Sequence, residues 1–416
     1  MSQGTVLVVN SGSSSIKYQL VDPVGGRAVA SGVVERIGEE TGSLTHTSGD
    51  TKVTRDEPIA DHAAGMRAIL ATFEEAGPDL SSAGVLAVGH RVVHGGSVFS
   101  TPALVDDDVV AQIEAISPLA PLHNPANVTG IRVARELLPH VPHVVVFDTA
   151  FFHGLPEAAS TYAIDRDVAR EHGVRRYGFH GTSHHYVSQQ VAGFLGRRVE
   201  DLNTIVLHLG NGASASAVRG GKAVETSMGM TPLEGLVMGT RSGDIDPAVI
   251  FHLQRNAGLS VDGIDDLLNR RSGLKGLAGE NDLRGLHDLV AQGDADAQLA
   301  LDVYVHRLRK YVGAYTAVLG RVDALVFTAG VGENDDIVRE LTCAGLEPLG
   351  YELDPALNEG RKKQPTVVSR DVSRATIVVY PTNEELAIAR QALEVTEAAG
   401  LTGEGSDEAP AATGHA

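Results

Sequence analysis

The chain has 416 residues, 43% hydrophobic and 21% charged, which is typical of a folded protein but long for a single core, so we expect two domains. Its 34 basic and 53 acidic residues give a formal charge of −19, which disfavours a nucleic-acid partner, and no apolar run could cross a membrane. The single cysteine, Cys343, excludes an internal disulfide and favours a cytoplasmic location.

The first elements expected along the chain are two strands, at 5–9 and 16–21, around the small polar turn NSGSSS at 10–15. Apolar residues at helical spacing then predict three helices, over 60–75, 107–116 and 125–138. A buried strand, HVVVFDTAFF, is expected over 143–152.

The opening pattern recurs in the second half of the chain. Residues 204–218, TIVLHLGNGASASAV, again predict strand, polar turn and strand, and 324–334, ALVFTAGVGEN, resemble the strand VVVFDTAFF with a polar end. This repetition indicates an internal duplication with a boundary near residue 150.

Helix starts are expected at three further places in this half. Asp246 and Pro247 suit an N-cap and first position, a long amphipathic helix covers 294–318, and Thr382 with Glu385 forms a capping box. Beyond Thr396 the sequence lacks apolar periodicity and is expected to be disordered.

Three glycine-rich turns could bring backbone N–H groups to a phosphate, at 10–15, 210–214 and 329–334. One such turn alone would more often be an ordinary flexible turn, and none fits the P-loop or dinucleotide patterns. If they converge, they form a polyphosphate cleft between the duplicated halves.

Several charged side chains adjoin these turns or end a strand. Lys17 could reach a terminal phosphate or could be a solvated edge-strand lysine. Arg91 and Arg241 lie in glycine-flanked loops that suit a bidentate grip on a carboxylate or phosphoryl group, or they are surface arginines. Asp148 ends a strand, where a Mg²⁺ or substrate-orienting carboxylate is plausible, whereas Glu384 could simply favour a helix N-terminus.

The histidines are less informative. His180 lies four residues before His184, but no Cys or Glu supports a zinc site, so we favour a hydrogen-bonding role for His180. His123 and His208 could be core histidines.

Taken together, these segments resemble the acetate kinase (acetokinase) family in order and spacing from residue 6 to 390. The similar segments are VLVVNSGSSSIKYQL, GHRVVHGG, PLAPLHNP, VVVFDTAFF, RRYGFHGTSHHYV, HLGNGASASAV, TSMGMTPLEGLVMGTRSGDIDP, FTAGVGEN and TNEELAIAR. The resemblance implies an α/β protein with two duplicated actin-like ATPase domains, of the acetate and sugar kinase/Hsp70/actin superfamily, around a central nucleotide cleft. The expected domains are 1–150, joined by a C-terminal helix at about 385–397, and 151–384, followed by a disordered tail at 398–416.

The resemblance also implies reversible phosphoryl transfer from ATP to acetate, giving acetyl phosphate and ADP, with Mg²⁺ (or Mn²⁺) and usually a homodimer. It places Asn10 and Glu384 at the metal, and Arg91, Asp148, His180 and Arg241 at the reaction. The implied acetate pocket is Val93, Leu122, Phe179 and Pro232, beside Arg91. The implied ATP contacts are Ser13, Ser15, Lys17, His208, Leu209, Gly210, Asn211, Gly212, Asp282, Leu283, Arg284, Gly330, Val331, Gly332, Glu333 and Asn334.

An acetate carboxylate is already ionised at neutral pH, so no general base is needed. We therefore interpret Asp148 as orienting an arginine or metal-bound water, although the family implies a catalytic acid. Alternatives are a propionate or butyrate kinase, distinguished by the volume near Val93 and Pro232, a phosphatase of the same superfamily, and a non-metabolic ATP-driven binding protein. Closure of the domains about hinges near 150 and 383 is expected.

Overall fold

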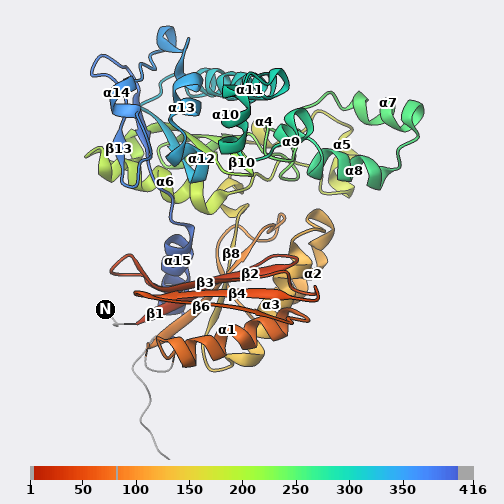
Figure 1. The fold of residues 1–416 in the computed structure, drawn as a ribbon, viewed down its shortest axis with the longest axis vertical. Helices are drawn as coiled ribbons and strands as arrows, with labels where there is room; N and C mark the ends of the chain where they lie inside the picture. Colours follow the sequence, from red (N-terminus) through yellow and green to blue (C-terminus); the bar gives the residue numbers. More distant parts are fainter. Residues whose placement is uncertain (1–3, 81–82, 402–416) are drawn as a thin grey trace, which may run out of the picture.

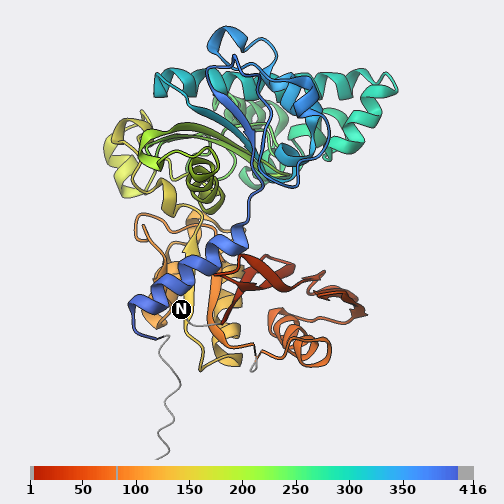
Figure 2. The same cartoon turned by 90° about the vertical axis from the view of Figure 1, so that its left-hand side faces the viewer.

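The computed structural model of the chain describes residues 4–80 and 83–401. Its strands form one sheet of eight strands and one of six. The two sheets lie in separate lobes, which Figure 1 and Figure 2 show one above the other. The last helix, α15 (Glu384–Ala398), returns to the first lobe and packs on its sheet. This arrangement confirms the predicted α/β class with two similar halves.

The first sheet has the strand order β5-β4-β3-β2-β1-β6-β8-β7. Its strands are β1 (Thr5–Ser11), β2 (Ser15–Asp22), β3 (Arg27–Glu35), β4 (Gly42–Ser48), β5 (Thr51–Glu57), β6 (Val85–Val92), β7 (Ala103–Leu104) and β8 (His143–Phe147). The predicted hairpin is present, with Asn10 opposite Lys17 in the antiparallel pair β1–β2. β1, β6 and β8 run parallel, so their carboxyl ends meet at one edge of the sheet.

Helices cover both faces of the first sheet. The side chains of a strand alternate between the two faces, so each face carries apolar residues that pack against a helix. Leu7 and Val9 of β1 join a buried cluster with residues of α1 and α3, whereas Val6 and Val8 join one with residues of α15. The three helices predicted before β8 are confirmed with small shifts, as α1 (His62–Ala76), α2 (Asp107–Ala115) and α3 (Asn124–Leu137).

The second sheet repeats the plan of the first. Its order is β11-β10-β9-β12-β14-β13, with β9 antiparallel to β10 and parallel to β12, as β1 is to β2 and β6. The strands are β9 (Asn203–Leu209), β10 (Ala213–Arg219), β11 (Lys222–Thr226), β12 (Ala324–Thr328), β13 (Thr366–Val367) and β14 (Thr376–Val379). The shared topology confirms the duplication inferred from the sequence.

Helices cover both faces of the second sheet as well. Val206 of β9 packs with residues of α6, whereas Ile205 and Leu207 face α11. The helices of this lobe are α4 (Glu157–Ser160), α5 (Arg166–Glu171), α6 (Gly181–Phe194), α7 (Ala248–Ala257), α8 (Val261–Arg270), α9 (Gly273–Ala278), α10 (Leu283–Ala291), α11 (Ala295–Leu319), α12 (Ala329–Asn334), α13 (Asp336–Cys343) and α14 (Pro355–Asn358). Short 3₁₀ helices are η1 (Ser117–Leu119), η2 (Ala150–Phe152), η3 (Val199–Asp201) and η4 (Glu347–Leu349).

Two local predictions near the strand ends were wrong. The segment AGVGEN is helix α12 and not a turn, and its first residue, Ala329, has a positive φ of 65°. The strand expected over 143–152 ends at Phe147, because Asp148 leaves the sheet to pair with an arginine and η2 follows.

Two predicted N-caps were also displaced. Asn383 caps α15 with its Oδ1 accepting from Leu386 N at 3.0 Å, while the hydroxyl of Thr382 contacts Ser183 at 2.9 Å. Asn is as good an N-cap as Thr, so the local sequence did not separate the two. α7 begins at Ala248 with Pro247 as its cap residue.

The domain limits 1–150 and 151–384 stay predictions, as do the hinges. They agree with the first sheet ending at Phe147 and the second beginning at Asn203. Most of the expected tail, residues 402–416, lies outside the described residues. Within the described ranges, no helix has the length and apolar character needed to span a membrane.

Candidate active site

An arginine and a buried aspartate meet where β6 and β8 end. Arg91 is the second-last residue of β6 and not part of a loop as expected, and Asp148 follows β8 directly. Arg91 Nε donates to Asp148 Oδ1 at 2.9 Å, and Nη2 donates to Oδ2 at 2.6 Å. The Asp148 side chain is 2% exposed and that of Arg91 is 23% exposed. Burial would lower the pKa of Arg91, but the charge and hydrogen bonds of Asp148 raise it, so the guanidinium stays charged.

The acidic start of α15 is close to this ion pair. Burial raises the pKa of Glu384 to about 7, although the nearby Arg91 charge lowers it. Asp148 and Glu385 add further negative charge that raises the pKa of Glu384. A buried carboxyl group with this excess of acidic neighbours suits a place where a cation would bind.

The second lobe brings His180 and Arg241 to the turn between β9 and β10. A Cβ built on Gly212 would lie 3.5 Å from both His180 Nε2 and Arg241 Nη1. His180 stands in the left-handed region, with a φ of 58°, immediately before α6. Such strain in a non-glycine residue is common at functional sites.

A chain of hydrogen-bonded hydroxyl and imidazole groups fixes the ring of His180. Its Nδ1 contacts Ser214 Oγ at 2.8 Å, Ser214 Oγ contacts His184 Nε2 at 2.7 Å, and His184 Nδ1 contacts Ser216 Oγ at 2.8 Å. Burial lowers the pKa of both histidines well below the usual value, so both are neutral. Ser214 thus fixes the ring of His180 with Nε2 toward Gly212.

Two arginines from different lobes act on the same histidines. Burial is the main cause that lowers the pKa of His123 and of His180. The positive charges of Arg241 and Arg91 lower both pKa values further. Both guanidinium groups therefore contribute positive charge at His123 and His180. Such a concentration of positive charge suits an anionic ligand in a chain of charge −19.

The predicted acyl-pocket residues are only partly brought together. Val93 and Phe179 belong to one buried cluster. Pro232 is linked to the site through its carbonyl, which accepts from Arg241 Nη1 at 3.1 Å. Leu122 is 43% exposed in the loop before α3 and is outside that cluster.

A pocket of about 550 Å³ in the second lobe gathers many of the predicted ATP contacts. The predicted residues that line it are Gly210, Asn211, Asp282, Leu283, Arg284, Gly330, Val331 and Asn334. It also contains residues that sequence reasoning missed: Gly239, Leu274, Asn281, His287, Tyr304, Asp335, Asp336, Ile337 and Arg361. Several of these adjoin predicted residues in sequence, but no local signal points to Arg361 or Tyr304.

The other predicted nucleotide contacts lie outside this lining. His208, Leu209 and Gly212 belong to the β9–β10 unit, where His208 Nδ1 contacts Ser183 Oγ at 2.8 Å. Gly332 is buried in α12, and Glu333 accepts a hydrogen bond from Thr382 N at 3.0 Å.

The first turn presents its predicted residues in the other lobe. Ser13 and Lys17 are exposed, and Ser15 is partly buried and begins β2. Asn10 and Lys17 line a hollow of about 310 Å³ together with Glu385. The hairpin therefore brings a cation and an amide beside the acidic start of α15.

Two proteins of similar sequence are named acetate kinase, and a family model matches most of the chain. The model of the acetokinase family matches residues 5–390. Acetate kinase of Streptomyces avermitilis is 58% identical over 393 residues, covering 94% of this chain and 97% of that protein. Acetate kinase of Corynebacterium efficiens is 56% identical over 394 residues, covering 94% and 99%.

Solved structures agree with these relatives over the whole fold. Acetate kinase of Porphyromonas gingivalis has a TM-score of 0.90 at 44% identity, covering 94% of this chain and 99% of that one. A propionate kinase from Francisella tularensis has a TM-score of 0.89 at 40% identity, covering 94% and 100%. The chain belongs to the acetokinase family.

Proposed function

We propose that the chain catalyses reversible phosphoryl transfer from ATP to acetate, giving acetyl phosphate and ADP. The observation that carries the proposal is geometric. Asp148 pairs with Arg91 and, through its backbone carbonyl, accepts from Gly181 N, beside His180, at 2.8 Å, and a Cβ on Gly212 would lie 3.5 Å from both His180 and Arg241. The second lobe also holds a nucleotide-sized pocket. The full-length similarity to acetate kinases supports the same reaction.

The reaction asks mainly for alignment and for compensation of negative charge. An acetate oxygen attacks the γ-phosphorus directly, because the carboxylate needs no base to become a nucleophile. Arg91 and Arg241 offset the repulsion between the two anions. Ser214 Oγ lies 2.8 Å from Nδ1 of neutral His180. When the Ser214 hydroxyl donates its proton to Nδ1, the ring proton of His180 is on Nε2 and can bond an equatorial phosphoryl oxygen.

Asp148 acts by orienting Arg91 and not by transferring a proton. Both of its carboxylate oxygens are engaged by Arg91, and the side chain is almost fully buried. The fork of the guanidinium is fixed at the end of β6 and keeps its remaining donors for the substrate.

Asn10 and Glu384 carry oxygen donors of the kind that Mg²⁺ prefers, and Asn10 lines a hollow with Glu385, the neighbour of Glu384. Burial raises the pKa of Glu384 because the nearby arginine does not fully compensate for it. A divalent cation beside Glu384 would stabilise the charged carboxylate. Mg²⁺ is usually held by one or two carboxylates together with substrate phosphates, and Mn²⁺ accepts the same ligands. When bound, the ion would neutralise charge on the phosphates of ATP.

Acetate is proposed as the preferred acceptor over propionate or butyrate. The close similarity to a solved propionate kinase means that the fold does not decide between them. Val93, Phe179 and Pro232 limit the space for the acyl group, and one methylene changes binding by about 1–3 kcal/mol.

Trapping of acyl phosphate with hydroxylamine tests this function. Acetate, propionate and butyrate should be compared with a reaction that lacks an acceptor. Turnover of ATP should depend on the acceptor and be most efficient with acetate. Equal ATP turnover with and without an acceptor would favour the ATP-driven binding protein instead.

Lys17 tests the part of the first hairpin in the same assay. Its position beside Asn10 supports contact with the terminal phosphate of ATP, because lysine is a common phosphate-binding point charge. Lys17→Ala should raise KM for ATP and lower kcat. Unchanged KM for ATP and unchanged kcat would indicate that Lys17 is a solvated edge-strand lysine.

We infer a homodimer formed through α7. Figure 1 shows α7 and α8 projecting from the second lobe, and α7 has no buried residue. Phe251 is 52% exposed and Val249 is 39% exposed, an apolar surface that a second copy would cover. Light scattering should find a dimer that Phe251→Asp dissociates, whereas Val372→Asp, at a valine exposed elsewhere, should leave it intact.

A cytoplasmic location stays a prediction. The free cysteine, Cys343, is buried in the second lobe, as is compatible with a reducing compartment.

A further inference from the structure

The segment from Ser227 to Pro247, here called the 227–247 loop, contains neither helix nor strand, yet it carries Pro232 and Arg241. Loops this long without secondary structure are usually functional. Fixing such a segment costs conformational entropy, so stabilising contacts must hold it.

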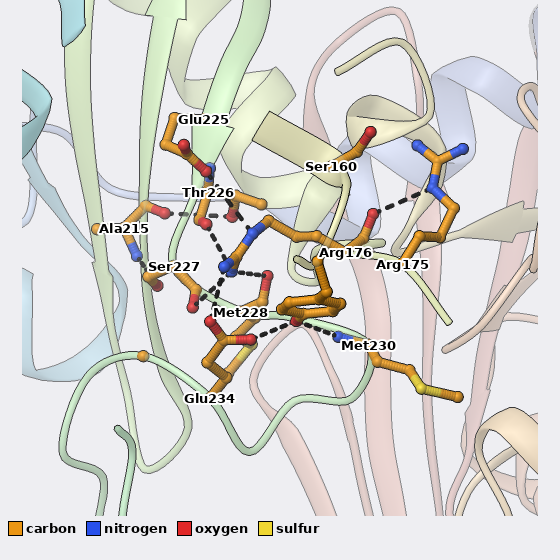
Figure 3. Close-up of polar contacts among 12 residues, drawn as sticks. Ser160, Arg175, Arg176, Ala215, Glu225, Thr226, Ser227, Met228, Met230 and Glu234 are labelled. Carbon is orange, nitrogen blue, oxygen red and sulfur yellow. Dashed lines mark hydrogen bonds and ion pairs between the residues drawn. The ribbon is translucent and has the colours of Figure 1, made fainter. Parts of the chain in front are cut away.

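Arg176 holds the start and the middle of this loop. Its Nη1 lies 3.1, 3.3 and 3.1 Å from the carbonyl oxygens of Thr226, Ser227 and Met228, as Figure 3 shows. Its Nη2 donates to Glu234 Oε1 at 2.6 Å. Carbonyl groups outside regular structure need donors when buried, so one guanidinium ties together residues eight positions apart, 226 and 234.

Tyr162 completes the contact from the other side. Its hydroxyl donates to Glu234 Oε2 and accepts from Met230 N at 3.1 Å, and the Arg176 guanidinium lies 5.5 Å from the centre of its ring. Residues 230 and 234 are therefore both fixed, and the turn between them carries Pro232. We call Arg176, Tyr162 and Glu234 the Arg176 network.

The fixed 230–234 turn positions Arg241. Pro232 O accepts from Arg241 Nη1 at 3.1 Å. In the part of the chain that the structure describes, no carboxylate lies within ion-pair distance of Arg241. The carbonyl of Pro232 is thus the main polar anchor of this guanidinium.

Charge in the Arg176 network is balanced internally. The Arg176 side chain is 16% exposed and pairs with Glu234, while Glu225 lies 3.8 Å away. Its positive charge is therefore not available to attract acetate or phosphate. Its effect on a reaction must come through the shape of the loop.

We propose that Arg176, Tyr162 and Glu234 are positioning residues that set the width of the acyl pocket at Pro232 and the direction of Arg241. The inference rests on the proposed function, since it concerns how this chain selects its carboxylate acceptor. The network selects for small carboxylic acids by holding the 230–234 turn against the acyl group.

Two conservative variants test the proposal, Tyr162→Phe and Glu234→Gln. A loosened turn should raise KM for acetate and increase the ratio of kcat/KM for propionate to that for acetate. A misdirected Arg241 should lower kcat by about 10- to 100-fold. KM for ATP should change little, because the loop contributes only Gly239 to the nucleotide pocket, and Gly239 lies outside the 230–234 turn and is held by Asn211 O at 3.0 Å.

Tyr351→Phe is the matched control. It also removes a buried tyrosine hydroxyl with a side-chain partner, but that partner is Thr316 of α11 and not a residue of the loop. It should leave KM for acetate and the acceptor ratio unchanged.

Thermal unfolding measured alongside separates positioning from stability. A folded Tyr162→Phe with native KM for acetate and a native acceptor ratio would overturn the proposal, even if it unfolded at a lower temperature. If Glu234→Gln does not fold, Tyr162→Phe decides, since it removes one oxygen atom only. Native protein without acceptor-dependent turnover would instead refute the proposed function.

Discussion

Replacing Asp148 with Asn should misdirect Arg91 while keeping nearly the same side-chain shape. In the native chain both carboxylate oxygens accept from Arg91, at 2.9 Å and 2.6 Å. The Asn amide would point an NH₂ group at one of the two Arg91 donors, so at least one bond would be lost. The guanidinium would then lose the fixed geometry that it needs at the substrate.

The size of the effect follows from burial and from the role proposed for Arg91. Removing one partner of a fully buried ion pair costs about 3–5 kcal/mol of stability. Because Arg91 is 23% exposed and water can reach it, we expect a smaller loss, about 1–3 kcal/mol. Weaker transition-state stabilisation should lower kcat by about 10²–10³.

The assay is acetyl phosphate formation at saturating Mg²⁺, together with denaturant unfolding. KM for ATP should change little, since the nucleotide pocket lies in the second lobe. Asp323→Asn is the control and should keep native kinetics; it removes the charge of a mostly buried aspartate that pairs with Arg197 at 3.0 Å and Arg321 at 3.2 Å. Near-native turnover by Asp148→Asn would refute the orienting role.

Four further outcomes are expected. Ser214→Ala removes the hydroxyl that contacts Nδ1 of His180, and kcat should fall about tenfold or more while KM for ATP stays native. Burial raises the pKa of Glu384 to about 7, so Mg²⁺ affinity should rise with pH up to about 7, with one proton released per ion bound. Without metal, the same shift means that the folded chain holds a proton that the unfolded chain releases, so stability should decrease as pH rises from the ordinary pKa of 4.5 toward 7. In Gly239→Ala the added methyl group would clash with Asn211 Oδ1 and displace it. KM for ATP should therefore rise in steady-state assays, while KM for acetate stays native.

Each of these outcomes has a clear contrary result. A native kcat in Ser214→Ala would show that His180 does not need the hydrogen bond with Ser214. A Mg²⁺ affinity that is flat with pH in titration calorimetry would remove Glu384 from the metal site. Native ATP binding by Gly239→Ala would separate residue 239 from the nucleotide pocket.

Sequence patterns predicted the elements whose signals are local. The hairpin of β1 and β2 follows from alternating apolar residues around a small polar turn, and α1, α2 and α3 follow from helical spacing. Where two neighbouring residues could serve equally, as Thr382 and Asn383 could at the start of α15, local preference gave the wrong cap.

The candidate site was partly readable for the same reason. Asp148 was correctly predicted at the end of a strand, whereas Arg91 was expected in a loop and lies within β6. Resemblance to a family supplied their roles. Tyr304 and Arg361 of the nucleotide pocket carry no such local signal and belong to segments that meet only in the folded lobe.

The sequence by itself determined the strands, the repeated turns and the residue types at their ends. The tertiary structure decided which of these residues touch. Arg91 and Asp148 are 57 residues apart, and they meet because β6 pairs with β8. Arg176 and Glu234 are 58 residues apart, and they meet because a long loop folds back on its support. Periodicity records the burial of each segment separately, whereas these contacts depend on strand order and loop path, which are properties of the whole chain.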